Sequence, residues 1–187
     1  MFKPLIAIPA VLMACACARP EAGPRPSTWA SSVERPGLPN LHQLSDELYR
    51  SAQPTAEGFA SLRTLEVRTV VNLRMFHSDQ PLARGTGLTL VDIPMESWDL
   101  DLDEVERFLE VVTDRQRQPV LVHCLHGADR TGTMSAVYRM VVQGWSVDDA
   151  IAEMRDGGFG FHSVWNNLPF SLRHLDVEAL RKRFTRH

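Results

Sequence analysis

A cysteine and an arginine six positions apart enclose a short glycine-containing segment, and this spacing suits the chemistry of phosphoryl groups. Cys124 begins the segment and Arg130 ends it. A cysteine attacks as its thiolate, and the amide groups of a tight loop before a helix favour that anion. A planar guanidinium can hold two phosphoryl oxygens and bind them more strongly as charge develops. The pair therefore predicts a nucleophile and an anion clamp that face one bound phosphate.

The residues around this pair suggest supporting roles. Thr131 can donate a hydrogen bond from its hydroxyl to the sulfur when a phosphocysteine breaks. Gly127 and Gly132 permit the backbone turn and the close approach to a ligand. His123 either orders the loop through its ring N–H groups or is merely structural, and both interpretations stay open. The expected phosphate-binding loop consists of Leu125, His126, Gly127, Ala128, Asp129 and Arg130.

A strand and a helix must flank this loop for it to cradle a phosphate. Pro119–Val122 is typical of a short buried strand, and Thr133–Val142 has the apolar face of a helix. Thr55, Asp101 and Ser146 are expected to begin three other helices. The remaining strands are expected at 41–44, 48–51, 67–73 and 89–93, and the remaining helices at 55–66, 101–117, 146–154 and 168–184. This alternation predicts an α/β fold, with a central sheet flanked by helices and the loop at the carboxyl end of a strand.

The composition indicates one globular domain, because 44% of the 187 residues are hydrophobic. A net charge of −3 argues against a nucleic-acid-binding protein that works through phosphate contacts. Three scattered cysteines provide no paired metal site, so no metal is expected. Outside the loop, residues 77–79 could line the rim of the pocket beside Arg74, but a solvated loop is the favoured interpretation. A second group could form a wall of the substrate site, but core packing is favoured for it; its members are Phe159, Phe161, His162 and Trp165.

The amino-terminal residues have the features of an export signal. Lys3 supplies a positive start, and the apolar run 4–14 is too short to cross a bilayer as a helix. Leu12–Cys15 resembles the bacterial lipobox, which implies a lipid on Cys15 and a lipoprotein of the bacterial cell envelope. Ala16, directly after this cysteine, is typical of lipoproteins that are sorted to the outer membrane, where the protein would face the periplasm. The alternative is an ordinary cleaved signal and a secreted protein.

Three segments follow from these patterns. Residues 1–15 are the expected signal peptide with its lipobox. Residues 16–37 are rich in proline and small polar residues, which predicts a flexible tether. Residues 38–187 are the expected catalytic domain.

The string HCLHGADRTG, residues 123–132, resembles the signature H-C-x-x-G-x-x-R-[ST]-G of the cysteine-dependent protein tyrosine and dual-specificity phosphatases, with every fixed position filled. The resemblance extends more loosely over residues 38–187, where Tyr49–Pro54 and Val71–Arg74 look like strands of bacterial dual-specificity-like members. It implies a protein tyrosine phosphatase-like fold and hydrolysis through a phosphocysteine, with no metal or cofactor. The implied substrate is a phosphorylated protein or a small phosphomonoester.

A phosphatase also needs an acid to protonate the leaving oxygen. In the family this is usually an aspartate on a separate loop, for which Asp99 is the candidate because Asp101 is better explained as a helix cap. Asp129 directly precedes Arg130, as in myotubularin-like lipid phosphatases and some bacterial tyrosine phosphatases, in which the loop aspartate is implicated as the acid. We favour Asp129 and keep Asp99 as the alternative.

Two other functions remain alternatives to a protein tyrosine or dual-specificity phosphatase. A phosphoinositide or inositol-phosphate phosphatase would suit the Asp-Arg loop and a membrane anchor, but His126 is not the basic residue expected beside a highly charged headgroup. A phosphate-binding module without turnover is disfavoured because Cys124, Arg130 and Thr131 are all intact. Turnover of p-nitrophenyl phosphate separates enzyme from module, and phosphopeptides compared with phosphoinositides separate the two enzymes.

Overall fold

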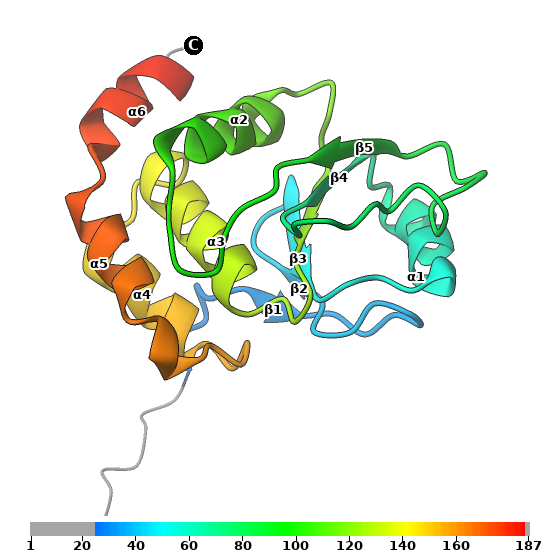
Figure 1. The fold of residues 1–187 in the computed structure, drawn as a ribbon, viewed down its shortest axis with the longest axis horizontal. Helices are drawn as coiled ribbons and strands as arrows, with labels where there is room; N and C mark the ends of the chain where they lie inside the picture. Colours follow the sequence, from blue (N-terminus) through cyan, green and yellow to red (C-terminus); the bar gives the residue numbers. More distant parts are fainter. Residues whose placement is uncertain (1–24, 186–187) are drawn as a thin grey trace, which may run out of the picture.

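A six-stranded sheet lies at the centre of the computed structural model, which describes residues 25–185 (Figure 1). The strand order is β1-β2-β3-β6-β4-β5. The four strands β3, β6, β4 and β5 run parallel, whereas β1 and β2 form an antiparallel edge. The strands are β1 (Ser31–Ser32), β2 (His42–Gln43), β3 (Leu48–Ser51), β4 (Thr69–Asn72), β5 (Thr89–Asp92) and β6 (Val120–His123).

Helices cover both faces of this sheet, which confirms the predicted α/β class. The helix α1 lies on one face, and α2 to α6 gather on the other (Figure 1). Among residues 25–185, no helix is long and apolar enough to cross a membrane. The helices are α1 (Ala56–Ser61), α2 (Leu102–Thr113), α3 (Asp129–Val141), α4 (Val147–Asp156), α5 (Asn167–His174) and α6 (Val177–Phe184), with short 3-10 turns η1 (Leu62–Leu65) and η2 (Ser163–Trp165).

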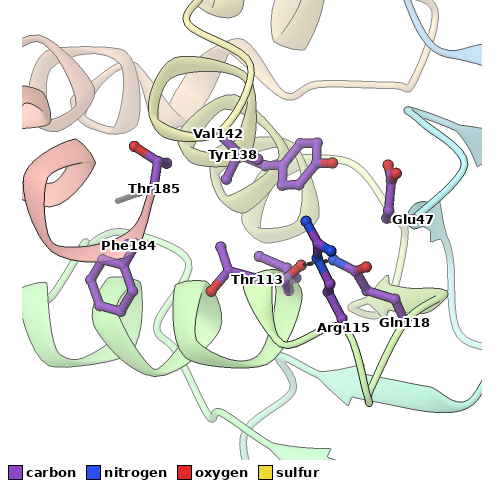
Figure 2. Close-up of a pocket in the computed structure, with 9 residues that line it drawn as sticks. Glu47, Thr113, Arg115, Gln118, Tyr138, Val142, Phe184 and Thr185 are labelled. Atoms are coloured by element: carbon purple, nitrogen blue, oxygen red, sulfur yellow. Dashed lines mark hydrogen bonds between the residues drawn. The ribbon is translucent and has the colours of Figure 1, made fainter. Parts of the chain in front are cut away.

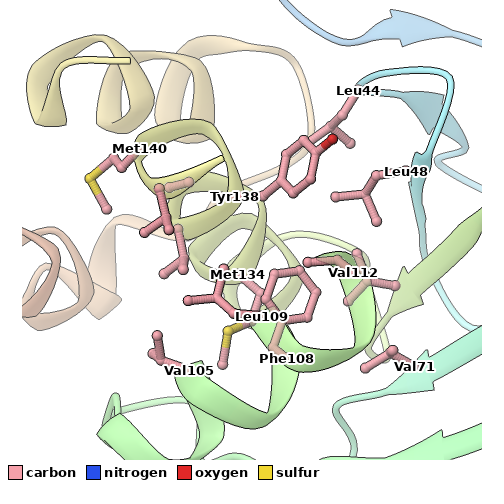
Figure 3. Close-up of a cluster of buried hydrophobic side chains, with 14 of the residues drawn as sticks. Leu44, Leu48, Val71, Val105, Phe108, Leu109, Val112, Met134, Tyr138 and Met140 are labelled. Atoms are coloured by element: carbon pink, nitrogen blue, oxygen red, sulfur yellow. The ribbon is translucent and has the colours of Figure 1, made fainter. Parts of the chain in front are cut away.

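The strand alternation divides the apolar side chains between two cores. Val122 of β6 packs in the larger core under α2 and α3, whereas Leu121 packs with Phe59 of α1 in the smaller one. Phe108 of α2 and Met134 of α3 meet in the larger core (Figure 3). This packing surrounds α3 with α2, α4, α5 and α6 and so holds the helix that follows the predicted phosphate loop.

The predicted helix starts are confirmed by their caps. The side chains of Thr55, Asp101 and Ser146 accept hydrogen bonds from backbone N–H groups in the first turns of α1, α2 and α4. The predicted end of α2 is wrong. The helix α2 ends at Thr113 rather than at Arg117, because Asp114 accepts a bond from the N–H of Gln116 and forms a turn.

The closing helix predicted over 168–184 is instead two helices. The first, α5, ends at His174. The carboxylate of Asp176 accepts a hydrogen bond from the N–H of Ala179 and begins α6. The helix after the phosphate loop begins earlier than predicted. It starts at Asp129, four residues before the predicted Thr133.

Part of the predicted tether belongs to the folded domain. Ala30 is buried and its N–H donates to the carboxylate of Glu153 over 2.6 Å, while Arg139 donates to the carbonyl of Thr28. Residues 31–32 form β1, paired with β2. The buried ion pair of Arg139 with Glu153 uses these backbone groups as hydrogen-bond partners, so residues 25–37 are not a free linker. The predicted signal, Cys15 and the rest of the tether lie outside the described residues.

Candidate active site

Cys124 and Arg130 open into the same cavity, as their spacing predicted. Cys124 follows β6 directly and is 3% exposed, and Arg130 lies in the first turn of α3. The cavity has a volume of about 400 Å³. Its lining consists of Ser97, Cys124, Leu125, His126, Asp129, Arg130, His162, Val164 and Trp165. A thiol, a guanidinium and the amino end of a helix therefore surround one space of ligand size.

Gly127 and Arg50 hold the loop against β3. Gly127 has a φ of +69°, and a Cβ there would lie 2.5 Å from the backbone of Ser51 and of Ala52. The Nη2 of Arg50 donates to the Gly127 carbonyl over 2.6 Å, and its guanidinium stacks 3.7 Å from the ring centre of Phe159. Burial lowers the pKa of Arg50 to about 10, so the side chain stays cationic at neutral pH. Neither Arg50 nor its role was predicted from the sequence.

The guanidinium of Arg130 is held in place by backbone carbonyls that follow two strands. Its Nη1 donates to the carbonyl of Leu73 after β4 and to that of Met95 after β5, over 3.3 and 3.4 Å. These bonds orient the planar group at the carboxyl ends of the strands. The arginine is therefore positioned before any ligand arrives, which favours anion binding.

Two further residues of the predicted signature lie just behind the loop. Thr131 is fully buried, and its Oγ1 has no hydrogen-bond partner among the described residues. Gly132 faces α4 so closely that a Cβ would lie 2.9 Å from the side chain of Met154. The threonine hydroxyl is therefore available to donate a hydrogen bond to a group in the loop, and the absence of a side chain on Gly132 allows α3 to pack closely against α4.

Asp129 lies at the cavity wall with a partner that sequence analysis assigned to the core. Its Oδ1 accepts from the N–H of His162 over 2.8 Å, and its Oδ2 lies 2.8 Å from the ring Nδ1 of the same residue. That distance is typical of a hydrogen bond between the two side chains. The rings of His162 and His126 are 5.7 Å apart on the same rim. His162 and Trp165 thus line the site, whereas Phe159 packs in the core as predicted.

Asp99 does not reach this cavity. It is exposed on the segment between β5 and α2, and its Oδ1 accepts from the N–H of Leu100 over 2.9 Å. From the same segment, Ser97 lines the cavity. Asp129 therefore lines the cavity that contains Cys124, and Asp99 does not.

A buried aspartate behind the loop was missed by sequence analysis. Asp79, interpreted as part of a solvated loop, is 2% exposed, and its Oδ2 lies 2.7 Å from the Nε2 of His123. Burial alone would raise the pKa of Asp79, but hydrogen bonds from His123 and Gln53 bring it below its ordinary value. The two residues are 44 positions apart, so no local pattern links them. Among residues 25–185 no cluster of histidine, cysteine and acidic side chains could hold a metal ion.

The fold and the loop define the class of cysteine-dependent phosphatases. A family model described as "DSP-PTPase phosphatase fused to NAD+ Kinase" matches residues 33–167. The chain belongs to this DSP-PTPase family of phosphatases.

Individual relatives agree with this assignment. The chain is 38% identical over 161 residues to the dual specificity protein phosphatase TpbA of Pseudomonas aeruginosa, a match that covers 86% of this chain and 72% of the relative. A crystal structure of P. aeruginosa TpbA has a TM-score of 0.77 and 35% identity, covering 87% of this chain and 100% of that one. Inositol diphosphatase DSP5 of Arabidopsis thaliana is 30% identical over 128 residues, which is 62% of this chain and 60% of the relative.

Proposed function

We propose that this phosphatase hydrolyses phosphomonoesters on proteins, with phosphotyrosine as its preferred substrate, through a phosphocysteine intermediate on Cys124. The observation that carries the proposal is the meeting of Cys124, Arg130 and the amino end of α3 in one cavity of about 400 Å³. Such a site binds the tetrahedral anion and stabilises the charge that develops during transfer.

In the first step the Cys124 thiolate attacks phosphorus, and an S–P bond forms as the P–O bond to the leaving group breaks. Arg130 binds the non-bridging oxygens. Asp129 donates a proton to the departing phenolate or alkoxide, a role supported by its place at the cavity wall.

In the second step a water molecule attacks phosphorus. Asp129, now ionised, accepts the proton of the water, and the S–P bond breaks to return the thiolate and release inorganic phosphate. The buried Oγ1 of Thr131, which has no partner among the described residues, is suited to donate a hydrogen bond to the departing sulfur. The chain's own side chains are sufficient for both steps.

The cavity walls support an aromatic phosphomonoester. Leu125, Val164 and Trp165 place apolar surface above the loop, where the ring of a phosphotyrosine would lie. A variant of P. aeruginosa TpbA, 34% identical with a TM-score of 0.77, has been crystallised in complex with phosphotyrosine.

An inositol-phosphate phosphatase is the second candidate, suggested by the relationship to DSP5. Its polyanionic substrate needs several cations at the rim. Arg130 is the one arginine or lysine among the residues that line this cavity, beside His126 and His162. The charge of the site therefore favours a singly phosphorylated group.

A substrate panel tests the proposal. Wild-type protein should release phosphate from phosphotyrosyl peptides with a higher kcat/KM than from phosphoseryl peptides, phosphoinositides or inositol pyrophosphates. The Cys124→Ser variant should release none while still binding the phosphotyrosyl peptide. A preference for the inositol compounds would replace the first candidate with the second. Tight binding without turnover by wild-type protein would indicate a phosphate-binding module.

We propose further that the protein is a lipoprotein of a bacterial cell envelope, anchored to the outer membrane through Cys15 and facing the periplasm. Support comes from the lipobox-like Leu12–Cys15 and the apolar run before it. Expressed in a bacterium with a labelled fatty acid, the wild type and a Cys17→Ser control should carry the label, and Cys15→Ser should not. Unlabelled wild-type protein in the medium would favour the secreted alternative.

A further inference from the structure

The loops that follow three adjacent strands meet around the ring of His123. This residue ends the central strand β6 and is fully buried. Gln53 follows the neighbouring strand β3, and Asp79 follows β4 on the other side. The Oδ1 of Asp79 accepts from Gln53 Nε2 over 2.9 Å, and its Oδ2 lies 2.7 Å from His123 Nε2. A carboxylate thus binds the histidine that immediately precedes the nucleophile.

Both ring nitrogens of His123 face hydrogen-bond acceptors. Nε2 faces the carboxylate of Asp79, and Nδ1 faces the carbonyl oxygen of Cys124 over 3.3 Å. A neutral imidazole has one N–H and can donate to one of these oxygens, whereas the doubly protonated ring can donate to both. In a fully buried position the unused acceptor would be left without its donor. The hydrogen-bonding pattern therefore matches the imidazolium form.

We propose that Asp79 is a positioning residue that keeps His123 doubly protonated, with its Nδ1–H on the backbone carbonyl of Cys124, and that this pair stabilises the attacking thiolate. The proposal deepens the proposed function and rests on Cys124 being its nucleophile. Asp79 does not touch the cavity and acts through His123.

The electrostatic environment is consistent with this arrangement. A buried imidazolium is unfavourable without a counter-charge, and the contact with Asp79 at 2.7 Å supplies one. The lowered pKa of Asp79 shows that its hydrogen bonds outweigh the effect of its burial.

Other charges surround the pair. On the Asp79 side, His77 lies 3.4 Å from Oδ1, and Arg74 donates to Gln53. Asp92, at the end of β5, is held by Asn72 of β4. Cys124 follows His123 directly in the chain. Arg130 donates to the carbonyl of Leu73, and the N–H of Leu73 donates to the carbonyl of His123. The aspartate, the imidazolium and the thiolate therefore alternate in sign toward the cavity.

The substitution Asp79→Asn tests the proposal because the sign of its effect is diagnostic. Loss of the counter-charge should release one proton from His123, so the positive charge beside Cys124 disappears and the thiolate becomes less favoured. The pH profile of Cys124 alkylation by iodoacetate should move to higher pH by about one unit, a tenfold loss of thiolate below the midpoint. The acidic limb of kcat/KM should move with it.

If Asp79 were only a structural hydrogen-bond acceptor, the Asp79→Asn variant would keep both profiles in place. If His123 kept both protons in the Asp79→Asn variant, loss of the nearby negative charge would favour the thiolate, and the alkylation profile would move to lower pH. Either result overturns the proposal. Asp92→Asn is the matched control, since it neutralises a carboxylate at the same end of the sheet that is bonded to Asn72, and it should leave the alkylation profile unchanged.

Ring nitrogen chemical shifts of His123 in the wild-type protein provide a second test that needs no variant. Both nitrogens should be protonated at pH 7, and an unprotonated Nδ1 would contradict the proposal even if Asp79→Asn failed to fold. Neither alkylation nor chemical shift depends on turnover. The substrate panel can therefore fail while these measurements succeed, and the two proposals are tested separately.

Discussion

The two ends of α3 form two cavities of similar size and different chemistry. At its amino end, Asp129 and Arg130 line the cavity of about 400 Å³ that contains Cys124. Near its carboxyl end, Tyr138 and Val142 line a cavity of about 350 Å³ between α2, α3 and α6 (Figure 2). The first end presents backbone N–H groups and partial positive charge, and the second presents carbonyls. Helix polarity, rather than cavity volume, therefore decides which end can bind and transfer a phosphoryl group.

The polar groups at the two ends are also held differently. The phosphate loop is bound by the cationic Arg50 and backed by the pair of His123 with Asp79, so ionisable groups hold it. At the other cavity, the Tyr138 hydroxyl bonds to Ser45 over 2.9 Å. Burial raises the pKa of Tyr138, so the phenol stays neutral at neutral pH. Substitutions at the two ends should therefore affect different properties.

The largest expected effect is that of Arg130→Lys. Lysine keeps the charge but cannot bind two phosphoryl oxygens in one plane. We expect kcat/KM for p-nitrophenyl phosphate to fall about 10³-fold, with the fold unchanged by circular dichroism. The surface variant Arg115→Lys, at the cavity of Figure 2, is the control. Equal losses in both variants would break the contrast between the two ends.

The second-largest effect is expected from removal of the general acid, which a comparison of Asp129→Asn with Asp99→Asn identifies. Removal of the acid should lower kcat about 10²-fold to 10³-fold for a substrate with a poor leaving group, and the basic limb of the kcat–pH profile should disappear. We expect this of Asp129→Asn, because Asp129 lines the cavity and Asp99 is exposed outside it. If Asp99→Asn alone removed the limb, the segment between β5 and α2 would have to close over the site during catalysis.

Gly127→Ala should have a smaller effect on activity and a measurable one on stability. The added Cβ would lie 2.5 Å from the backbone of β3 at a φ of +69°. A loop displaced by about 1 Å should lose about 10²-fold in kcat/KM. Gly158→Ala is matched in backbone strain, with a φ of +83° and open space around it. It should lower Tm without that loss of kcat/KM. Equal kcat/KM in the two variants would refute the close contact with β3.

Tyr138→Phe should have the smallest effect on catalysis. It removes the hydrogen bond to Ser45 and should lower the free energy of unfolding by about 1 kcal/mol. Because the hydroxyl lies at the other end of α3, kcat and KM should stay within about twofold of wild type. A large change in kcat would mean that the two cavities communicate through the helix.

The phosphate loop and the fold class were predictable because their information is local. The signature carries its own strand and helix, and the strand-like segments at 48–51, 89–93 and 119–122 each overlap a short strand of the sheet. The caps at Thr55, Asp101 and Ser146 depend on side chains next to the backbone groups that they bind, and all three predictions are confirmed.

The remaining features depend on contacts between distant residues. Arg50 resembles any polar position of a strand until its partners Gly127 and Phe159 are known. Asp79 becomes visible only when β4 and β6 are adjacent. Residues 25–37 have the composition of a linker. Arg139 and Glu153 bind part of this segment through its backbone N–H and carbonyl groups, and these groups are present in any sequence, so no side-chain pattern marks the contact. The break between α5 and α6 was readable in principle from the cap at Asp176.

The most direct test of the account is to trap the covalent intermediate. Wild-type protein, mixed with excess phosphotyrosyl peptide and quenched within the first turnovers, is digested and analysed by mass spectrometry. We expect one phosphoryl group on the peptide that contains Cys124, more of it in Asp129→Asn because the water is then not activated, and none in Cys124→Ser. Continued turnover with no phosphoryl group on Cys124, or its appearance on another side chain, would contradict the account.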